Sequence, residues 1–333
     1  MNEVHKQPEI EEKNHAAGND FAEDSRRITG SRAYQRLACR SRVVQPVTAE
    51  FPFCVGSRLY HVDEVARIGK NIAKMLSLNE TLCESIGYGH DIGHPPYSHI
   101  GDLALSELTG ISLKHGMYGV FIAQKIEKLN LTPETLRGIM LHTDGFDVAR
   151  EDFPDEYRLT AYADVIEWVL SDVDDAVACS YLYKEKVPAF ATKLGDSRQE
   201  RICTVVDSLV DESKRKGEIK FSEGPVAGNF WALKDFLVEE VYSKLAESRG
   251  YEPHKMLIRQ AYKFFGENFP DVSPLLAVHD LTDAEANHFG KVISETKDPK
   301  EILRRISHFG VFGIMHQLKG MEYSEPDLKL ERQ

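Results

Sequence analysis

Apolar side chains recur at a helical period along most of the chain, and this pattern constrains the fold more than any other feature. The pattern is clearest over residues 62–76, where the apolar positions fall on one face of a helix. A second amphipathic segment over 80–89 follows after a short polar break, which predicts that the two helices pack antiparallel. Strand patterns are rare, so we expect a nearly all-α fold with at most a short hairpin, for which 216–221 is the candidate strand.

The same period predicts the remaining helices and the division of the chain. Residues 1–24 are polar and charged, and we expect a disordered tail there. Residues 25–246 form the predicted core, and 247–333 form a C-terminal helical lobe packed on it, where the periodicity weakens. Further helices are expected over 100–108, 116–129, 133–142, 154–182, 197–214, 230–245, 254–266, 282–295 and 299–308.

The composition excludes several classes of protein. The 333 residues carry a formal net charge of -12, which argues against a generally basic nucleic-acid-binding surface. The 5 cysteines are scattered without a CxxC pair, which favours reduced thiols over a zinc ribbon. No apolar run approaches the roughly 20 residues that span a bilayer, and the first residues are polar, so we expect a cytoplasmic protein without membrane contact.

A stretch of ten residues from His90 to His99 concentrates the chemistry of the chain. It contains three histidines and Asp91, with a glycine and two prolines between them. A single histidine is usually a hydrogen-bonded core or surface group. Five histidines within residues 61–115 instead favour a functional site. His61, His90 and Asp91 offer two imidazoles and a carboxylate, a donor mixture that suits several divalent metals.

Asp164 is the best candidate for a further metal donor. It lies between apolar residues in a segment that the periodicity places in the core. Burial of an unpaired carboxylate costs several kcal/mol, so Asp164 needs a cation or strong donors nearby. The alternative is an aspartate that caps a helix or pairs with an arginine.

The spacing of these residues resembles the HD-domain superfamily, and in particular its deoxynucleoside triphosphate triphosphohydrolases, the dGTPase-like enzymes. The motif reads Arg58-x-x-His61, then His90-Asp91-x-Gly-His94-x-Pro-x-x-His99, then a downstream Asp164. Segments 27–37, 131–139 and 236–242 are also similar, so the resemblance covers about residues 25–245. It implies an HD-domain helical core with additional C-terminal helices.

The resemblance implies a role for each residue of the motif. His99 and Asp102 match a histidine–acid pair at the scissile phosphate, and their i,i+3 spacing lets the carboxylate orient the imidazole. One divalent ion per site is implied, with Mn, Mg, Fe, Zn, Ni and Co all open. The implied sets are His61, His90, Asp91 and Asp164 for the metal; His99, Asp102 and His115 for catalysis; and Arg58, His94, Trp168 and Asp172 for the substrate.

The implied activity is hydrolysis of a deoxynucleoside triphosphate to a deoxynucleoside and tripolyphosphate. A nucleotide is then the substrate, a homo-oligomer is expected, and single-stranded nucleic acid or a nucleotide effector is a further possible partner. The sequence departs from the family at Trp168, where a tyrosine is usual, and at Val165, where a charged residue is usual. Residues 313–317 stand where the family carries a Met-Thr-Asp-Arg-Tyr stretch.

Two alternatives remain open at the level of the sequence. The protein is an HD-type nucleotidase or phosphodiesterase that acts on another nucleotide, or a catalytically decayed protein that senses nucleotides or binds nucleic acid. The His99–Asp102 pair argues against the second alternative, because a pure binding protein has no need of a proton-transfer pair.

Overall fold

The computed structural model describes residues 20–42, 56–143, 153–244 and 251–326. These residues are almost entirely helical, and their β pairing is limited to the isolated bridges Ser41–Ser57 and Val272–Lys319. The short strand expected over 216–221 is not formed. α10 (Arg198–Lys216) extends to Lys216 and ends at Gly217, whose φ of 72° suits a glycine, and a loop follows.

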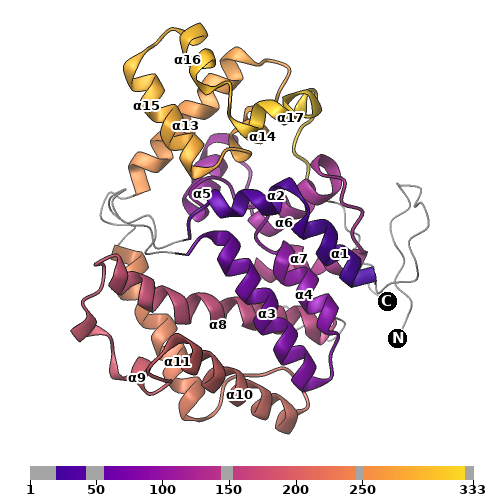
Figure 1. Ribbon diagram of the computed structural model, residues 1–333, viewed down its shortest axis with the longest axis vertical. Coiled ribbons are helices and arrows are strands. Elements are labelled where there is room, and N and C mark those ends of the chain that lie inside the picture. Colours follow the sequence, from indigo (N-terminus) through magenta and orange to yellow (C-terminus); the bar gives the residue numbers. More distant parts are fainter. Residues whose placement is uncertain (1–19, 43–55, 144–152, 245–250, 327–333) are drawn as a thin grey trace.

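α3 (Arg58–Leu76) and α4 (Glu80–Gly89) form the antiparallel pair that the sequence predicts. Ser57 caps α3 and Asn79 caps α4, each through a side-chain oxygen that accepts a backbone N–H. The two helices approach closely at Gly87, where a Cβ would lie 2.5 Å from the Cα of Ala66. α1 (Asp20–Thr29), α7 (Pro133–Leu141) and α8 (Asp155–Ala178) pack around this pair (Figure 1).

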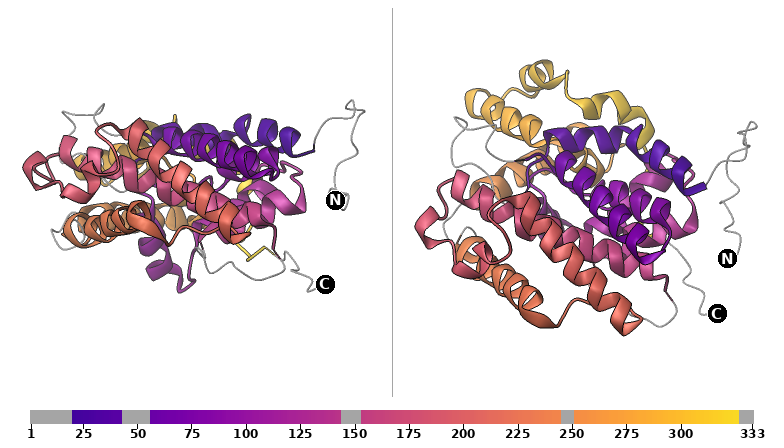
Figure 2. Two further views of the ribbon diagram at one scale, coloured as in Figure 1. Left: turned by 90° about the horizontal axis from the view of Figure 1, so that it is seen from below. Right: turned by 60° about the horizontal axis from the view of Figure 1, so that its bottom comes forward.

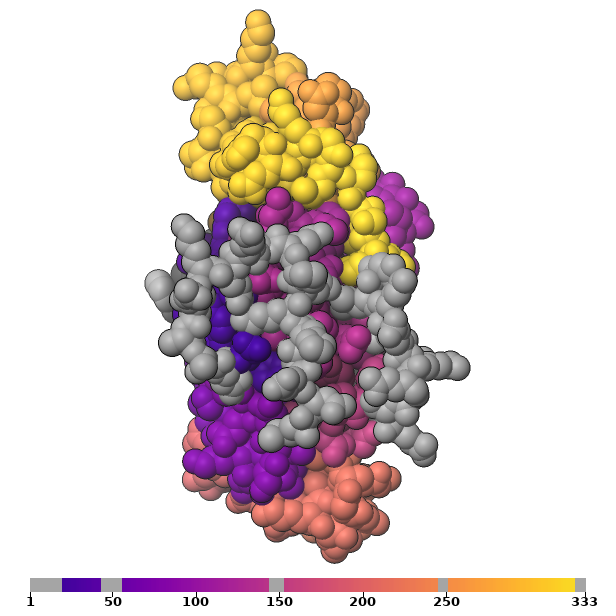
Figure 3. Space-filling model, turned by 90° about the vertical axis from the view of Figure 1, so that its right-hand side faces the viewer, coloured from indigo at the N-terminus to yellow at the C-terminus, as the bar shows by residue number. Residues whose placement is uncertain are grey.

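The remaining helices extend the molecule in two directions from this centre. One group at one end comprises α9 (Ala189–Thr192), α10 and α11 (Gly224–Leu237), with the π-helical turn η5 (Val238–Tyr242) (Figures 1 and 2). The other end is formed by the C-terminal helices, α13–α17, and Figure 3 shows the same order on the surface. Their bounds are α13 (Tyr251–Asn268), α14 (Pro274–His279), α15 (Asp283–Glu295), α16 (Pro299–Ile306) and α17 (Gly310–Leu318).

α5 (His99–Thr109) and α6 (His115–Phe121) connect the central helices to the C-terminal ones. α6 continues into the π-helical turn η2 (Ile122–Ile126), and α13 and α14 pack against α5. Short segments complete the fold: α2 (Arg32–Arg36), η1 (Leu37–Cys39) and η4 (Lys184–Lys186).

Two clusters of buried apolar side chains form the core. One cluster combines α1, α4, α5 and α6 with the C-terminal helices, and it includes Phe121, Phe265 and Phe289. The other lies among α3, α8, α10 and α11. The C-terminal helices therefore share a core with the helices around the histidine stretch, and the predicted boundary near residue 246 stays a prediction.

The disordered tail is predicted for residues 1–24. Of these, residues 1–19 lie outside the described residues. α1 begins at Asp20 and buries Phe21 and Asp24. Asp24 accepts hydrogen bonds from the backbone N–H and hydroxyl of Thr132, which joins α1 to the start of α7. No helix among the described ranges combines the length and apolarity that a membrane span requires.

Candidate metal centre and active site

Four side chains from three helices and a loop bring their donor atoms together. His61 lies in the first turn of α3, His90 caps the C-terminus of α4, Asp91 follows in the loop, and Asp164 lies in α8. His61 Nε2 lies 3.2 Å from His90 Nε2 and 3.1 Å from Asp164 Oδ1. Asp91 Oδ2 lies 3.4 Å from the Nε2 atom of each histidine. His61, His90 and Asp164 therefore form one possible donor set, and Asp91 lies beside both of its imidazoles.

The hydrogen bonds of the two imidazoles direct their lone pairs into this donor set. His61 Nδ1 contacts the carboxylate of Glu167, and His90 Nδ1 donates to the carbonyl oxygen of Gly87 at 2.7 Å. Both partners are acceptors, so the Nδ1 atoms carry the protons and the Nε2 atoms are free to bind a cation. Two Nε2 lone pairs at 3.2 Å, beside two carboxylates, fit a divalent metal ion.

Glu167, the partner of His61 Nδ1, is not among the residues that the sequence predicts for the site. It is completely buried, and it accepts from Arg42 at 2.9 Å, Ser171 at 2.6 Å and Arg198 at 2.7 Å, besides contacting His61. Burial by itself would raise its pKa, but Arg42 and His61 lower the pKa to about 2. The available signal was its position three residues after Asp164 on a helix otherwise bound for the core.

His61 responds to the same charges. Burial by itself would lower its pKa, but Glu167 and Asp164 raise the pKa to about 9. Without a cation the donor set therefore retains a proton on His61. A metal ion in this place would compensate the carboxylate charge that the proton otherwise balances.

A second cluster is centred on Asp102, in the first turn of α5. Its Oδ2 lies 3.3 Å from His94 Nδ1, 3.5 Å from His115 Nδ1 and 3.7 Å from His99 Nδ1. Burial would raise the pKa of Asp102, but the neighbouring rings of His115, His94 and His99 hold that pKa well below the usual range. The carboxylate is therefore ionised and faces the Nδ1 atoms of three imidazoles.

The three histidines of this cluster differ in exposure. The His99 side chain is 58% exposed, whereas His94 is buried and stacks on His115 with ring centroids 3.8 Å apart. Burial, together with Arg58 and His115, lowers the pKa of His94 to about 3, so its ring is neutral. His99 is therefore the histidine of the cluster that an incoming group can reach.

His142, which the sequence analysis did not single out, joins the two clusters. Its Nε2 lies 3.0 Å from His115 Nε2, which in turn lies 3.8 Å from Asp91 Oδ1. Its Nδ1 donates to the carbonyl oxygen of Ile139 at 2.6 Å, so its Nε2 lone pair faces His115. The available signal was a histidine at the C-terminal end of a predicted helix, close to the setting of His90, which directly follows one. Asp91, His115 and His142 form a second set of possible metal donors.

Arg58 lies beside the metal donors instead of at the surface. Its guanidinium contacts the carboxylate of Asp91 and donates from Nε to Ser98 Oγ at 3.0 Å. The side chain is buried. In this structure Arg58 contacts a predicted metal donor, and its role in binding the substrate stays a prediction.

Asp172 and Trp168 lie on the next turns of α8 beyond Asp164. The hydroxyl of Tyr242 donates to Asp172 Oδ2 at 2.5 Å, and Arg42 lies 3.2 Å from Asp172 Oδ1. The rings of Trp168 and Tyr242 are 5.9 Å apart. Both oxygens of Asp172 thus face protein groups, and its predicted contact with a sugar hydroxyl stays a prediction.

Comparison with known proteins assigns the class of this fold and site. The family model of the HD domain matches residues 58–169, which hold all four predicted metal donors. The chain is 32% identical over 255 residues to a deoxyguanosinetriphosphate triphosphohydrolase-like protein of Caldanaerobacter subterraneus subsp. tengcongensis, covering 75% of this chain and 73% of that protein. A protein of the same description from Clostridium perfringens is 30% identical over 279 residues, covering 81% and 80%.

The site and the match define an HD-domain protein. Within that class, the chain belongs to the family of deoxyguanosinetriphosphate triphosphohydrolase-like proteins, as the identity and coverage of these relatives show. A crystal structure of a hypothetical protein from Aquifex aeolicus covers 85% of this chain and 70% of its own, with a TM-score of 0.49 and 18% identity. A similarity of that size carries no argument about function.

Proposed function

We propose that this protein is a metal-dependent phosphohydrolase that cleaves deoxynucleoside triphosphates into a deoxynucleoside and tripolyphosphate. The observation that carries the proposal is the donor set of His61, His90, Asp91 and Asp164 beside an exposed histidine that is backed by the partly buried carboxylate of Asp102. The family of the chain supports the same chemistry. A metal donor set and a proton-transfer group in adjacent positions are what hydrolysis of a phosphate ester requires.

Each group has a defined task in this proposal. One divalent ion held by the four donors would polarise an oxygen of the α-phosphate and lower the pKa of a bound water. His99 donates a proton to the leaving 5′ oxygen, and Asp102 holds its ring and stabilises the imidazolium form. His94 and His115 fill the space behind His99 and restrict how the ring of His99 turns.

A product assay tests the proposal. Metal-loaded protein incubated with a panel of deoxynucleoside triphosphates should release tripolyphosphate, and His99→Ala should abolish most of that release while retaining the metal. His316→Ala removes an exposed histidine of α17 far from the cluster and should behave as the wild type. Release of pyrophosphate or orthophosphate in place of tripolyphosphate would contradict the assigned bond.

The second donor set favours one alternative activity. Asp91, His115 and His142 could hold a second divalent ion, and two ions would together supply the charge stabilisation that suits hydrolysis of phosphate mono- and diesters. An HD-type nucleotidase or phosphodiesterase is therefore the second candidate. Turnover of a nucleoside monophosphate or cyclic nucleotide, without turnover of triphosphates, would select it.

The expected partners follow from the first proposal. A nucleotide is the substrate, and we expect a homo-oligomer, which light scattering of the purified protein tests. Binding without turnover by the metal-loaded wild type would instead favour the nucleotide-sensing alternative.

A further inference from the structure

The histidine loop, residues 90–98, is fixed by side chains that lie far away in the sequence. Arg40 is buried, and its guanidinium donates to the carbonyl oxygens of His94 and, at 2.8 Å, of His279. His279 Nε2 in turn donates to the carbonyl oxygen of Gly93 at 2.8 Å. The end of α14 thus contacts the backbone of the loop that carries His90 and Asp91.

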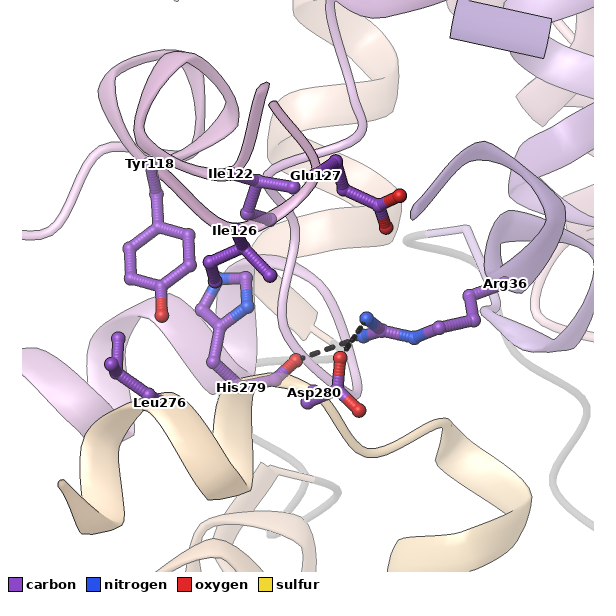
Figure 4. A pocket seen from close by; sticks show the side chains of 8 residues that line it. All are labelled: Arg36, Tyr118, Ile122, Ile126, Glu127, Leu276, His279 and Asp280. Atoms are coloured by element: carbon purple, nitrogen blue, oxygen red, sulfur yellow. Dashed lines mark hydrogen bonds and ion pairs between the residues drawn. The ribbon is translucent and has the colours of Figure 1, made fainter. Parts of the chain in front are cut away.

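α14 meets α2 and α6 around a small pocket, which Figure 4 shows. Figure 4 shows the ring of Tyr118, from α6, beside the imidazole of His279, and the two rings stack with centroids 3.5 Å apart. Arg36, from α2, reaches the carboxylate of Asp280 and the carbonyl oxygen of His279. The C-terminal helices therefore meet the loop through a defined set of contacts, and not through a loose surface.

The loop ends in two consecutive residues with an unusual backbone. Tyr97 has a φ of 61°, and Ser98 has a φ of 53° with a ψ of -124°. Side chains other than glycine rarely adopt these conformations, so surrounding contacts must hold them. His99 is the first residue of α5. The two residues therefore set the direction in which His99 and Asp102 leave the loop.

Asp283, the first residue of α15, supplies a contact to this segment. Its Oδ1 accepts the backbone N–H of Tyr97 at 2.8 Å. Its Oδ2 accepts the backbone N–H of Ser41 at 2.9 Å and also the Ser41 hydroxyl. The carbonyl oxygen of Ser41 accepts from Ser98 Oγ at 2.8 Å. One carboxylate thus closes a ring of hydrogen bonds around the two unusual residues.

Two further contacts connect this ring to the metal centre and to α15. Ser98 Oγ also accepts from Nε of Arg58, whose guanidinium contacts the metal donor Asp91. The hydroxyl of Tyr97 donates to Asn287 Oδ1 at 3.0 Å, one turn after Asp283 on the same helix. A displacement at Asp283 would therefore reach both the start of α5 and the metal donors.

We propose that Asp283 is a positioning residue for the hydrolytic site, through which the C-terminal helices take part in catalysis. It holds Tyr97 and Ser98 in their conformations and so aims His99 and Asp102 at the substrate side of the metal donors. The effect of Asp283 on the rate of hydrolysis rests on the proposed function. The effect of Asp283 on the hydrogen exchange of the histidine loop does not depend on that function.

Hydrogen exchange tests the structural consequence in the full-length protein. Asp283→Ala should speed the exchange of the backbone amides of residues 93–102 by about 10-fold or more, because Tyr97 N–H loses its acceptor. Asp283→Asn keeps one acceptor oxygen and should fall between the alanine variant and the wild type. Asp298→Ala is the matched control, since Asp298 is likewise a carboxylate at the start of a C-terminal helix, but its side chain accepts the backbone N–H of Lys300 within that helix.

Steady-state kinetics test the functional consequence. Asp283→Ala should lower kcat by about 10–100-fold at saturating metal, as expected for a misplaced catalytic group, with KM unchanged. Asp283→Asn should recover part of kcat, and Asp298→Ala should retain all of it. If the loop exchanges in Asp283→Ala as in the wild type, or if Asp298→Ala has the same effect, the proposal is overturned. If the wild type turns over no nucleotide, the proposed function fails and the exchange experiment still decides.

Discussion

At the scale of single residues, the metal centre depends on a carboxylate that is not itself a metal donor. Glu167 contacts His61 Nδ1 and is held by Arg42, Arg198 and Ser171 in a buried position. Carboxylates in this position fix the tautomer and orientation of the imidazole and increase its basicity. The affinity for metal is therefore distributed over more residues than those facing the ion.

Substitution of Glu167 tests this dependence. We expect Glu167→Gln to weaken binding of Mn²⁺ by about 10–100-fold, because the neutral amide no longer supports the charge on the imidazole. Glu84→Gln removes a carboxylate from the ion pair with Lys70, away from the centre, and should leave the affinity unchanged. Equal affinities of wild type and Glu167→Gln in a metal titration would show that Glu167 serves only the packing of α8.

Asp175 gives the stability of the protein a dependence on pH. Burial raises its pKa from 3.8 to about 7, with Arg42 opposing the shift. A carboxyl whose pKa is higher in the folded state stabilises the fold below its unfolded pKa, and the contribution disappears as the pH rises through the folded value. The loss between pH 6 and pH 8 is about 1 kcal/mol, at 1.36 kcal/mol per pKa unit.

Substitutions of two neighbouring aspartates distinguish the contribution of Asp175 to the pH dependence of stability from that of other groups. Asp175→Asn should flatten the decline of the free energy of unfolding between pH 6 and pH 8, as measured by urea denaturation. Asp174→Asn changes an adjacent carboxylate that pairs with Arg201 at the surface, and the decline should persist. A decline of the same size in both variants would assign the effect to another group.

At the scale of elements, the histidine loop packs directly against α6. A Cβ at Gly93 would lie 2.0 Å from the carbonyl oxygen of His115 and 2.2 Å from the backbone nitrogen of Gly119. These neighbours are backbone atoms of a helix and cannot rotate away. Glycine at position 93 therefore allows the approach that brings His115 beside Asp91.

Gly93→Ala should separate the loop from α6. We expect a loss of about 1–3 kcal/mol in the free energy of unfolding, as for other overpacked sites, together with loss of hydrolysis. Gly228→Ala places a methyl group where no heavy atom lies within 4 Å, on the exposed side of α11. That variant should be more stable by about 0.5–1 kcal/mol with unchanged activity. Unaltered stability of Gly93→Ala in urea would contradict the close approach.

The sequence predicts elements and local motifs better than it predicts their partners. The amphipathic period locates α3, α4, α7 and α15 within a few residues, because burial of one face is a local property of a helix. The histidine spacing and the family resemblance give His61, His90, Asp91 and Asp164 as metal donors, and that role stays a prediction. Glu167 and His142 are single polar residues in helices, and their roles depend on which side chains the fold brings to them. No local pattern connects Asp283 to Tyr97, which lies 186 positions earlier.

At the scale of the whole molecule, the C-terminal helices and the active-site helices share one core. Phe289 from α15 and Phe265 from α13 are fully buried in the same cluster as Phe121 from α6. A shared core couples the stability of the two regions. We therefore expect one cooperative unfolding transition in which the loss of helix and the loss of metal coincide.

A substitution that creates a cavity beside α15 tests whether the C-terminal helices and the active-site helices unfold together. Phe289→Ala should lower the free energy of unfolding by about 3–5 kcal/mol. The denaturant midpoint for metal release and the midpoint for loss of helix should fall by the same amount. Met256→Ala removes a side chain that is 51% exposed in α13, and both midpoints should stay near those of the wild type. Metal release that keeps its wild-type midpoint in Phe289→Ala would mean that the two regions unfold independently.

The hydrogen bonds from His279 and Asp283 to the histidine loop have a consequence for the order of synthesis. The metal donors are all present once Asp164 has been made, but the loop receives its last contacts from residues more than a hundred positions later. A nascent chain that stops after α8 therefore contains every predicted metal donor without the geometry that places His99. We therefore expect the histidine loop to reach its final geometry late in translation, after α14 and the start of α15 have left the ribosome.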